Sequence, residues 1–317
     1  MPEQRPIQQK TDDLLNGVAR AVCYSGFRTG QHPDRGDGAV NPTDAQILED
    51  LKIISTDSQF NLIRLYDCGE NSEAVLRIIK TNKLNIKVML GIWLKAELSN
   101  HETCVWLTEP IPQEELDQNY LLNQQEIDRG IRLANQYPEQ VIAVNVGNEA
   151  LVDWNDHKVD TDSIIAYVQR VKGAIDQPVT VADNYEWWAA NGQKLARELD
   201  FVAIHVYPVW EGKDINEAMS YTIENVQKVR DALPDSRLVI TEAGWASIAS
   251  EFGERASEEK QLKYYNDLYA WAIEMNITTF FFEAFDEDWK GDPANPNGAE
   301  KHWGLFTVDR KPKKVMQ

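Results

Sequence analysis

Eight short apolar runs recur along the chain, and each is continuously hydrophobic rather than alternating between apolar and polar positions. Continuous runs of this kind are typical of strands that are buried on both faces, as in a parallel sheet. The runs cover residues 17–28, 61–69, 86–94, 141–151, 178–188, 200–210, 237–247 and 278–289. The pattern therefore predicts eight parallel strands.

The segments between the runs have the spacing of amphipathic helices. In residues 43–55, apolar positions recur every three or four residues behind Thr43 or Asp44, either of which can cap a helix. Residues 119–137 and 257–276 show the same period. Strand and helix alternate eight times, which predicts an α/β fold: a single (β/α)8 TIM barrel with its active site at the C-terminal ends of the strands.

A doubly wound sheet is the alternative fold, but no Gly-x-Gly-x-x-Gly follows the first run, so its dinucleotide-binding version is disfavoured. The predicted domains are an N-terminal extension over residues 1–16 and a catalytic domain over 17–317. Irregular insertions are expected at 95–118 and 289–303, on the C-terminal face. The polar N-terminus has no apolar segment of the kind found in a signal peptide. The location is therefore left open, and a secreted or periplasmic one is favoured if a leader has been removed.

Charge and composition exclude several classes of partner. The chain has 51 acidic and 32 basic residues, a net charge of −19, which disfavours nucleic acid. No run approaches the ~18 apolar residues of a membrane span. Cys23, Cys68 and Cys104 lack CxxC spacing, so neither a disulfide framework nor a zinc site is indicated. A monomer is the default expectation.

Polar and aromatic residues cluster at the ends of the apolar runs. A barrel would bring these ends together around one opening, where aromatic faces can stack on sugar rings and polar groups can bind hydroxyls. The residues are Tyr24, Arg28, Tyr66, Asp67, Trp93, Asn148, Glu149, Asp183, Asn184, Tyr185, His205, Tyr207, Trp210, Glu242, Trp245, Glu283, Asp286 and Glu287. This composition is typical of a carbohydrate cleft.

Glu149 and Glu242 have the spacing of a catalytic pair. They lie 93 residues apart, from 149 to 242, and three strand–helix units of about 31 residues would span that interval in an eightfold barrel. The two carboxylates should therefore face each other across the mouth, one donating a proton and the other attacking the anomeric carbon of a glycoside. The amide of Asn148, beside the first acid, could bind the sugar 2-hydroxyl.

Seven motifs resemble glycoside hydrolase family 17, the β-1,3-glucanases and related glucanosyltransferases with a retaining mechanism and a (β/α)8 barrel. They are VCYSGFRTGQHPD, IRLYDC, VNVGNEAL, HVYP, VITEAGWAS, FEAFDEDWK and HWGLF, in the expected order from about Gly17 to Pro312. Two departures from plant members are the Gly-Trp-Ala-Ser after Glu242, where those have Gly-Trp-Pro-Ser, and Trp289, where they have a polar residue. The long loop 95–117 is similar to that of bacterial members and could wall off part of the cleft.

The resemblance implies an endo-β-1,3-glucanase (laminarinase) that cleaves laminarin-type β-1,3-glucan by double displacement. In such enzymes the residue matching Glu149 is the acid/base and the residue matching Glu242 is the nucleophile. Glu287 and Lys290 match a feature that supports the acid through hydrogen bonds or charge balance. The predicted substrate contacts, from the strand ends and the resemblance together, are Tyr24, Arg28, Tyr66, Trp93, Asn148, Asn184, Tyr185, Tyr207, Trp210, Trp245, Phe285, Glu287, Trp289 and Lys290.

Other functions fit the sequence less well. A β-1,3-glucanosyltransferase would use the same intermediate, and action from chain ends is an alternative if the long loop closes the cleft. A non-catalytic glucan-binding protein would not need both glutamates. The five histidines are scattered, so no metal and no cofactor is expected, and His205 is predicted to orient a neighbour or bind substrate. Ser25 and Ser247 lie outside any Gly-x-Ser-x-Gly elbow.

Overall fold

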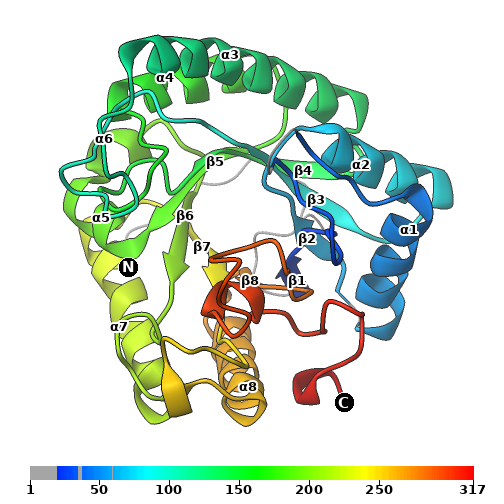
Figure 1. Cartoon of the computed structure of the whole chain (residues 1–317). Helices are drawn as coiled ribbons and strands as arrows, with labels where there is room; N and C mark the ends of the chain where they lie inside the picture. The colour runs from blue at the N-terminus through cyan, green and yellow to red at the C-terminus, as the bar shows by residue number, and fades with distance from the viewer. Residues whose placement is uncertain (1–19, 35–37, 59) are drawn as a thin grey trace.

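The strands of the protein close into a parallel barrel in sequence order, β1 to β8 (Figure 1). This computed structural model describes residues 20–34, 38–58 and 60–317, so the predicted N-terminal extension, 1–16, lies outside the described residues. β1 pairs with both β2 and β8, which closes the sheet. The closed barrel confirms the predicted (β/α)8 fold and rules out the doubly wound alternative, which has open edges.

Every strand lies inside one of the eight apolar runs. The strands are β1 (Arg20–Cys23), β2 (Leu62–Arg64), β3 (Lys87–Ile92), β4 (Val141–Asn148), β5 (Val179–Asn184), β6 (Val202–Val206), β7 (Leu238–Ala243) and β8 (Thr279–Phe281). They are shorter than the runs because each run continues past the C-terminal end of its strand, in most cases into a loop and after β5 directly into a helix that begins at Tyr185. The candidate site is built from the last strand residues together with the residues that follow them.

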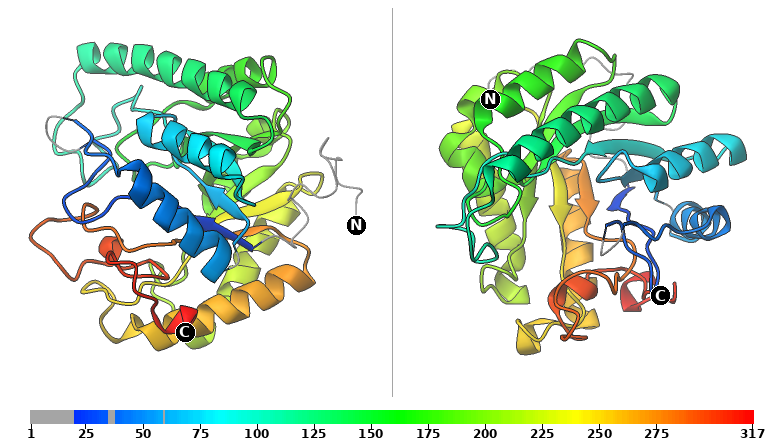
Figure 2. Two further views of the ribbon diagram at one scale, coloured as in Figure 1. Left: turned by 90° about the vertical axis from the view of Figure 1, so that its right-hand side faces the viewer. Right: turned by 45° about the horizontal axis from the view of Figure 1, so that its top comes forward.

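Helices cover the outside of the barrel (Figures 1 and 2). They are α1 (Asp44–Lys52), α2 (Glu70–Asn82), α3 (Gln113–Gln136), α4 (Thr161–Lys172), α5 (Tyr185–Asn191), α6 (Gln193–Ala196), α7 (Ile215–Ala232) and α8 (Glu258–Glu274). A π-helical turn, Ile53–Asp57, continues α1, and short 3-10 turns lie at Gly253–Arg255, Ala299–Lys301 and Lys314–Met316.

The start of α1 follows the predicted capping chemistry. Thr43 accepts a hydrogen bond from the backbone N–H of Gln46, and the Gln46 side chain accepts one from the Thr43 backbone N–H. This reciprocal pair satisfies two of the amide groups that a helix start leaves without partners.

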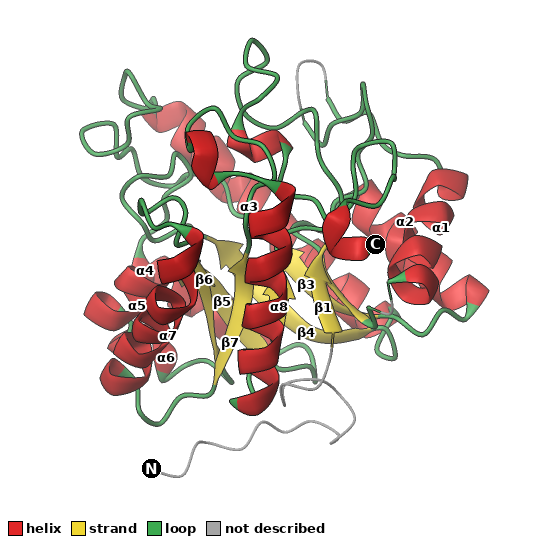
Figure 3. Cartoon of the chain, turned by 90° about the horizontal axis from the view of Figure 1, so that it is seen from below, coloured by secondary structure: helices red, strands yellow, loops and turns green. Residues whose placement is uncertain are grey.

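The insertion after β3 is shorter than predicted, because α3 begins at Gln113 rather than near residue 119. Pro112 precedes the first turn, and Glu114 and Glu115 lie within it, where carboxylates favour a helix N-terminus. The irregular segment that remains, 93–112, lies with the other long loops at one end of the barrel (Figure 3). Among the described residues, no helix has the length and apolar character needed to cross a membrane.

Candidate active site

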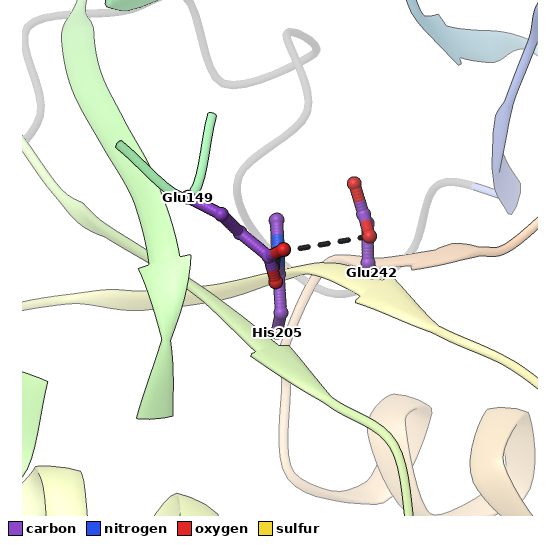
Figure 4. A group of neighbouring side chains, drawn as sticks. All are labelled: Glu149, His205 and Glu242. Atoms are coloured by element: carbon purple, nitrogen blue, oxygen red, sulfur yellow. Dashed lines mark hydrogen bonds and ion pairs between the residues drawn. The ribbon is translucent and has the colours of Figure 1, made fainter. Parts of the chain in front are cut away.

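Glu149 follows the last residue of β4 in a backbone conformation that side chains rarely adopt. Its φ is 48°, and the preceding Gly147 has φ 83°, so the chain turns sharply at the strand end. A non-glycine residue in this left-handed region costs of order 1–3 kcal/mol and persists only where its surroundings hold it. The turn points the carboxylate toward His205 on the neighbouring side of the site, and His205 Nδ1 contacts it (Figure 4).

Hydrogen bonds from two neighbouring segments hold this turn. The backbone N–H of Glu149 donates to the carbonyl of Ala182 on β5 at 2.9 Å. From the loop between β4 and α4, Asn155 Nδ2 donates to the Glu149 carbonyl at 3.2 Å, and His157 Nε2 donates to the Asn148 carbonyl at 2.8 Å. The strained conformation of Glu149 is thus fixed from both sides.

Glu242, on β7, is 6% exposed, and both of its carboxylate oxygens are hydrogen-bonded. Oε1 accepts from Arg64 Nη1 at 2.6 Å and from Tyr66 Oη at 3.0 Å. Oε2 accepts from Tyr207 Oη at 2.6 Å. The adjoining Gly244 is required by packing, since a Cβ there would meet the Phe282 carbonyl oxygen at 2.2 Å.

His205, on β6, lies between the two glutamates (Figure 4). Its Nδ1 is 2.9 Å from Glu149 Oε1 and 3.6 Å from Glu242 Oε2. A carboxylate oxygen of each glutamate and one His205 nitrogen all lie within 4.8 Å of one another. The two glutamates therefore face each other across the barrel mouth, as the spacing of 93 residues between positions 149 and 242 predicts.

Arg64, the last residue of β2, contacts His205, Asn148 and Glu242. Its Nη1 lies 3.2 Å from His205 Nε2, and its Nη2 donates to Asn148 Oδ1 at 2.5 Å. A guanidinium only donates hydrogen bonds, so His205 Nε2 accepts and Nδ1 carries the proton that faces Glu149. Arg64 thereby fixes the tautomer of His205, the orientation of the Asn148 amide and the position of Glu242.

The surroundings of Glu242 favour its ionised form. Burial alone would raise the pKa of Glu242, but the electrostatic interaction with His205, the positive charge of Arg64 and the hydrogen bonds from Tyr207 and Tyr66 outweigh burial and lower it. Burial raises the pKa of Cys23, the thiol beneath the carboxylate, to about 12, so it stays protonated. A buried carboxylate that keeps its charge has the property of a nucleophile.

The same three side chains could in principle hold a metal ion. Glu149, His205 and Glu242 each offer one ligand atom within the 4.8 Å group. The Arg64 guanidinium, however, donates to Glu242 and contacts the second nitrogen of His205. A cation bound between these ligands would lie beside a buried positive charge, so the donor set does not fit a divalent metal.

A second buried charge cluster lies after β8. Lys290 Nζ is 2.8 Å from Glu283 Oε2 and 2.5 Å from Glu287 Oε2. Glu287 also accepts hydrogen bonds from Ser25 Oγ and from Trp289 Nε1. Burial and the charge of Glu287 raise the pKa of Glu283 well above its usual range, although Lys290 opposes them.

Glu287 is 0% exposed, so the direct sugar contact predicted for it is wrong. Its carboxylate is enclosed because the lysine and the tryptophan of the same turn close over it. A supporting role for Glu287 and Lys290 through charge balance stays a prediction.

Four aromatic residues predicted to touch the substrate are enclosed in the fold, so direct contact is wrong for them too. Tyr185 and Trp245 are 0% exposed, and Tyr24 and Phe285 are 1% exposed. Trp245 Nε1 donates to the Arg255 carbonyl, and Tyr185 Oη donates to Glu211. Tyr24 bonds to Asp50 of α1 and packs edge-on against Phe285.

Two polar residues predicted to bind sugar are engaged in the framework of the barrel. Arg28 Nη2 lies 2.8 Å from both Glu49 and Asp50 of α1. Asn184 caps α5 by accepting a hydrogen bond from the Glu186 N–H at 2.8 Å. Their contribution to substrate binding stays a prediction.

The remaining predicted contacts have surface that a sugar could reach. They are Tyr66, Trp93, Asn148, Tyr207, Trp289 and Lys290, which are half-buried, and Trp210, which is 45% exposed. Trp93 stacks on His157 with ring centroids 4.6 Å apart, on the side of Glu149. Trp210 packs edge-on against Phe252, also at 4.6 Å, beyond β6. Aromatic surface thus lies on both sides of the glutamate pair.

Sequence reasoning missed Arg64 as a functional residue, and it placed Asp183 at the predicted cleft without a role. Arg64 is a charge inside an otherwise apolar run, which indicates a buried residue with partners. Asp183 accepts hydrogen bonds from the backbone N–H groups of Leu151 and Asn184, at 2.9 and 2.8 Å, and so steadies the loop that follows Glu149. Its position at a strand end was visible, but its partner in another loop was not.

Solved structures share this architecture. An endo-laminarinase from Formosa is 27% identical, with a TM-score of 0.83 over 97% of this chain and 88% of that one. A glycoside hydrolase family 17 β-1,3-glucanosyltransferase from Rhizomucor miehei is 23% identical, with a TM-score of 0.72 over 94% of this chain and 97% of that one. At that identity the second likeness shows the fold alone.

Sequence relatives agree with the structural ones. A glucan 1,3-beta-glucosidase from Schizosaccharomyces pombe is 26% identical over 292 residues, 86% of this chain and 81% of that protein. A probable glucan endo-1,3-beta-glucosidase from Aspergillus clavatus is 27% identical over 85% of this chain, which spans only 39% of that longer protein. The sequence model of the BtgE/BtgC glycoside hydrolase domain matches residues 21–304. Because that match covers most of the chain, the protein belongs to the family of BtgE/BtgC glycoside hydrolase domains.

Proposed function

We propose that this protein is a retaining hydrolase of β-1,3-glucan, with Glu149 as acid/base and Glu242 as nucleophile. The observation that carries the proposal is the approach of the two carboxylates, since one oxygen of Glu149 lies within 4.8 Å of one oxygen of Glu242. Retaining glycosidases keep their carboxyl groups about 5–5.5 Å apart, whereas inverting enzymes leave about 6.5–9.5 Å for a water molecule. The short separation favours attack by a carboxylate over attack by water.

In the first step Glu242 attacks the anomeric carbon and Glu149 protonates the departing glycosidic oxygen. The C–O bond to the leaving chain breaks as an ester bond to Glu242 forms. The hydrogen bonds from Arg64, Tyr66 and Tyr207 keep Glu242 ionised and oriented before attack. His205 Nδ1–H holds the Glu149 carboxyl on the side from which the proton is delivered.

In the second step Glu149 acts as a base. It takes a proton from water, the resulting hydroxide equivalent attacks the anomeric carbon, and the ester bond to Glu242 breaks. Two inversions at one carbon give net retention of configuration. We propose that the amide of Asn148, whose Oδ1 accepts a hydrogen bond from Arg64, binds the 2-hydroxyl, a contact that would strengthen in the transition state.

The proposed substrate is a laminarin-type β-1,3-glucan, and the proposed mode is internal cleavage. The names of the Formosa, Schizosaccharomyces and Aspergillus relatives all concern β-1,3-glucan. Two of these three have endo in their names, which supports internal cleavage. We further propose that the protein is a member of glycoside hydrolase family 17. The aromatic surfaces at Trp93 and Trp210, on both sides of the glutamate pair, suit a chain that continues in both directions.

Stereochemistry tests the proposal. Time-resolved proton NMR of the protein with a β-1,3-gluco-oligosaccharide should show shorter products that appear first as the β-anomer. Early α-anomer would contradict the retaining mechanism, and products longer than the substrate would indicate glucanosyl transfer. Intact oligosaccharide after long incubation would contradict the proposed activity.

Azide separates the roles of the two glutamates. With an aryl β-glycoside as substrate, Glu149→Ala plus azide should form the β-glycosyl azide, because azide replaces water on the intermediate. Glu242→Ala plus azide should form the α-glycosyl azide, because azide takes the place of the nucleophile. Glu254→Gln, an exposed acid in the loop after β7, is the matched control and should retain the parent rate. The same azide anomer from both variants would refute the assignment.

A further inference from the structure

Four apolar side chains on the catalytic face lie unusually open to solvent. Val105 is 81% exposed and Trp106 is 76% exposed, both in the loop between β3 and α3. Leu98, in the same loop, is 40% exposed, and Trp154, in the loop between β4 and α4, is 44% exposed. We call these four residues the Trp106 surface. Single exposed apolar residues are ordinary, but two tryptophans on neighbouring loops are typical of a binding surface.

The two loops that carry the Trp106 surface are fastened to each other. The backbone N–H groups of Glu97 and Leu98 both donate to the Lys158 carbonyl, at 2.9 and 3.0 Å. Asn100 Nδ2 donates to the carbonyls of Asp153 and Asn155, at 2.7 and 2.8 Å.

The fastening continues toward the tip of the longer loop. Thr103 Oγ1 donates to the Asp153 carbonyl at 3.0 Å, and the Cys104 thiol donates to the Trp154 carbonyl at 3.1 Å. Cys104 is itself 1% exposed, so the loop is packed up to the residue that precedes the exposed Val105 and Trp106. The two tryptophans are therefore held on one preorganised unit, which lowers the ordering cost of binding.

This unit is continuous with the candidate active site. Asn155 and His157, in the loop that carries Trp154, donate to the carbonyls of Glu149 and Asn148. Trp93, at the start of the other loop, stacks on His157. Aromatic rings thus lead outward from the acid/base, and the longer loop reaches beyond the rim of the barrel (Figure 2).

We propose that the Trp106 surface binds glucosyl units of a β-1,3-glucan chain that lie outside the catalytic cleft. The flat face of an indole offers apolar surface to the C–H face of a sugar ring, and a neutral chain is not repelled by a protein of net charge −19. The inference rests on the proposed function, and it adds that long chains gain affinity that short oligosaccharides do not. The loop then extends the binding site instead of closing it.

Binding measurements in a Glu242→Gln background test the surface without turnover. Isothermal titration with a β-1,3-linked trisaccharide and an octasaccharide compares cleft binding with extended binding. Adding Trp106→Ala or Trp154→Ala should weaken octasaccharide binding roughly three- to tenfold, the loss expected for one ring contact, and leave trisaccharide binding unchanged. Tyr120→Ala, which removes a 48% exposed ring on α3, is the matched control and should change neither affinity.

Several outcomes would overturn the inference. Unchanged octasaccharide affinity in both tryptophan variants would mean that the surface does not contact glucan. Equal weakening of both oligosaccharides would mean that the substitutions disturb the cleft instead. A change of sedimentation mass on Trp106→Ala would identify the surface as a contact between two copies of the chain. If Glu242→Gln without a further substitution binds neither oligosaccharide, both the proposed function and the inference fail. In the other outcomes Glu242→Gln binds glucan, and only the inference about the Trp106 surface fails.

Discussion

Replacing Arg64 by methionine removes a buried charge that touches three groups of the candidate active site. Arg64 is 0% exposed and lies 2.6 Å from Glu242, so its loss leaves a buried carboxylate without its ion-pair partner. With about 4 Å between charge centres and an effective dielectric constant of about 20, the attraction is about 4 kcal/mol. An opposite charge at this range lowers a carboxyl pKa by about one to three pH units.

The sign of the effect on activity follows from the roles assigned to the two glutamates. In the parent protein the lowered pKa of Glu242 keeps the nucleophile ionised as the pH falls, so activity persists into acid. In Arg64→Met, burial is no longer offset by the guanidinium and the pKa of Glu242 rises. The acid limb of the kcat/KM profile should therefore move up by about one to three pH units.

The assay is the pH dependence of kcat/KM on a β-1,3-gluco-oligosaccharide, with circular dichroism at each pH to confirm that the variant is folded. Removing one partner of a buried pair also costs about 3–5 kcal/mol of stability, so the measurements belong well below the melting temperature. Arg64→Lys is the matched control, because it keeps the charge but loses the fork that reaches both Glu242 and Asn148. It should lower kcat while leaving the acid limb near that of the parent. An acid limb that stays in place in folded Arg64→Met would refute the electrostatic reasoning.

Three further predictions concern the supports of the site. Asn155→Ala should lower kcat about tenfold with little change in KM or melting temperature, because one hydrogen bond that holds the turn at Glu149 is lost; a kcat equal to that of the parent would contradict this role. Lys290→Met should lower the free energy of unfolding by about 3–5 kcal/mol in urea titrations, since the buried Glu287 loses its counter-charge and Glu283 loses a hydrogen-bond partner. Lys314→Met, at an exposed pair, should leave the free energy of unfolding unchanged. The three cysteines are buried, and burial raises the pKa of Cys23 to about 12, so a disulfide reagent at mildly alkaline pH should titrate no fast thiol in the native protein and three after unfolding; a rapidly reacting native thiol would disagree with the packing described.

Much of the fold could be predicted because parallel strands buried on both faces leave an unmistakable pattern. Each of the eight apolar runs contains one strand, and the helices at 44–52 and 258–274 lie within the predicted segments. The start of α3 was misplaced because Leu116 is the single apolar residue in 113–118, too few to form a recognisable apolar stripe. The helical state of this first turn and a half is favoured by Pro112 and the acidic residues Glu114 and Glu115. Local polarity alone does not distinguish a loop from an exposed helical turn.

The candidate site was predictable in part for a related reason. A carboxylate at the end of an apolar run must reach a cleft or a counter-charge, so Glu149 and Glu242 could be paired by counting strands. Aromatic residues carry no such requirement. Tyr24, Tyr185 and Trp245 follow strand ends in the sequence, but the packing of the surrounding helices and loops encloses them, and local pattern does not predict that packing.

The sequence by itself determined the alternation of strands and helices, the closure into eight units and the delivery of two glutamates to one end of the barrel. These features depend on local periodicity and on chain length, which a linear sequence contains in full. Only the tertiary structure decided that Arg64, 178 residues away from Glu242, lies beneath it and also contacts His205 and Asn148. The protonation and orientation of a buried side chain depend on the charges and donors around it, and those come from strands that are distant in sequence and adjacent only after the barrel has closed.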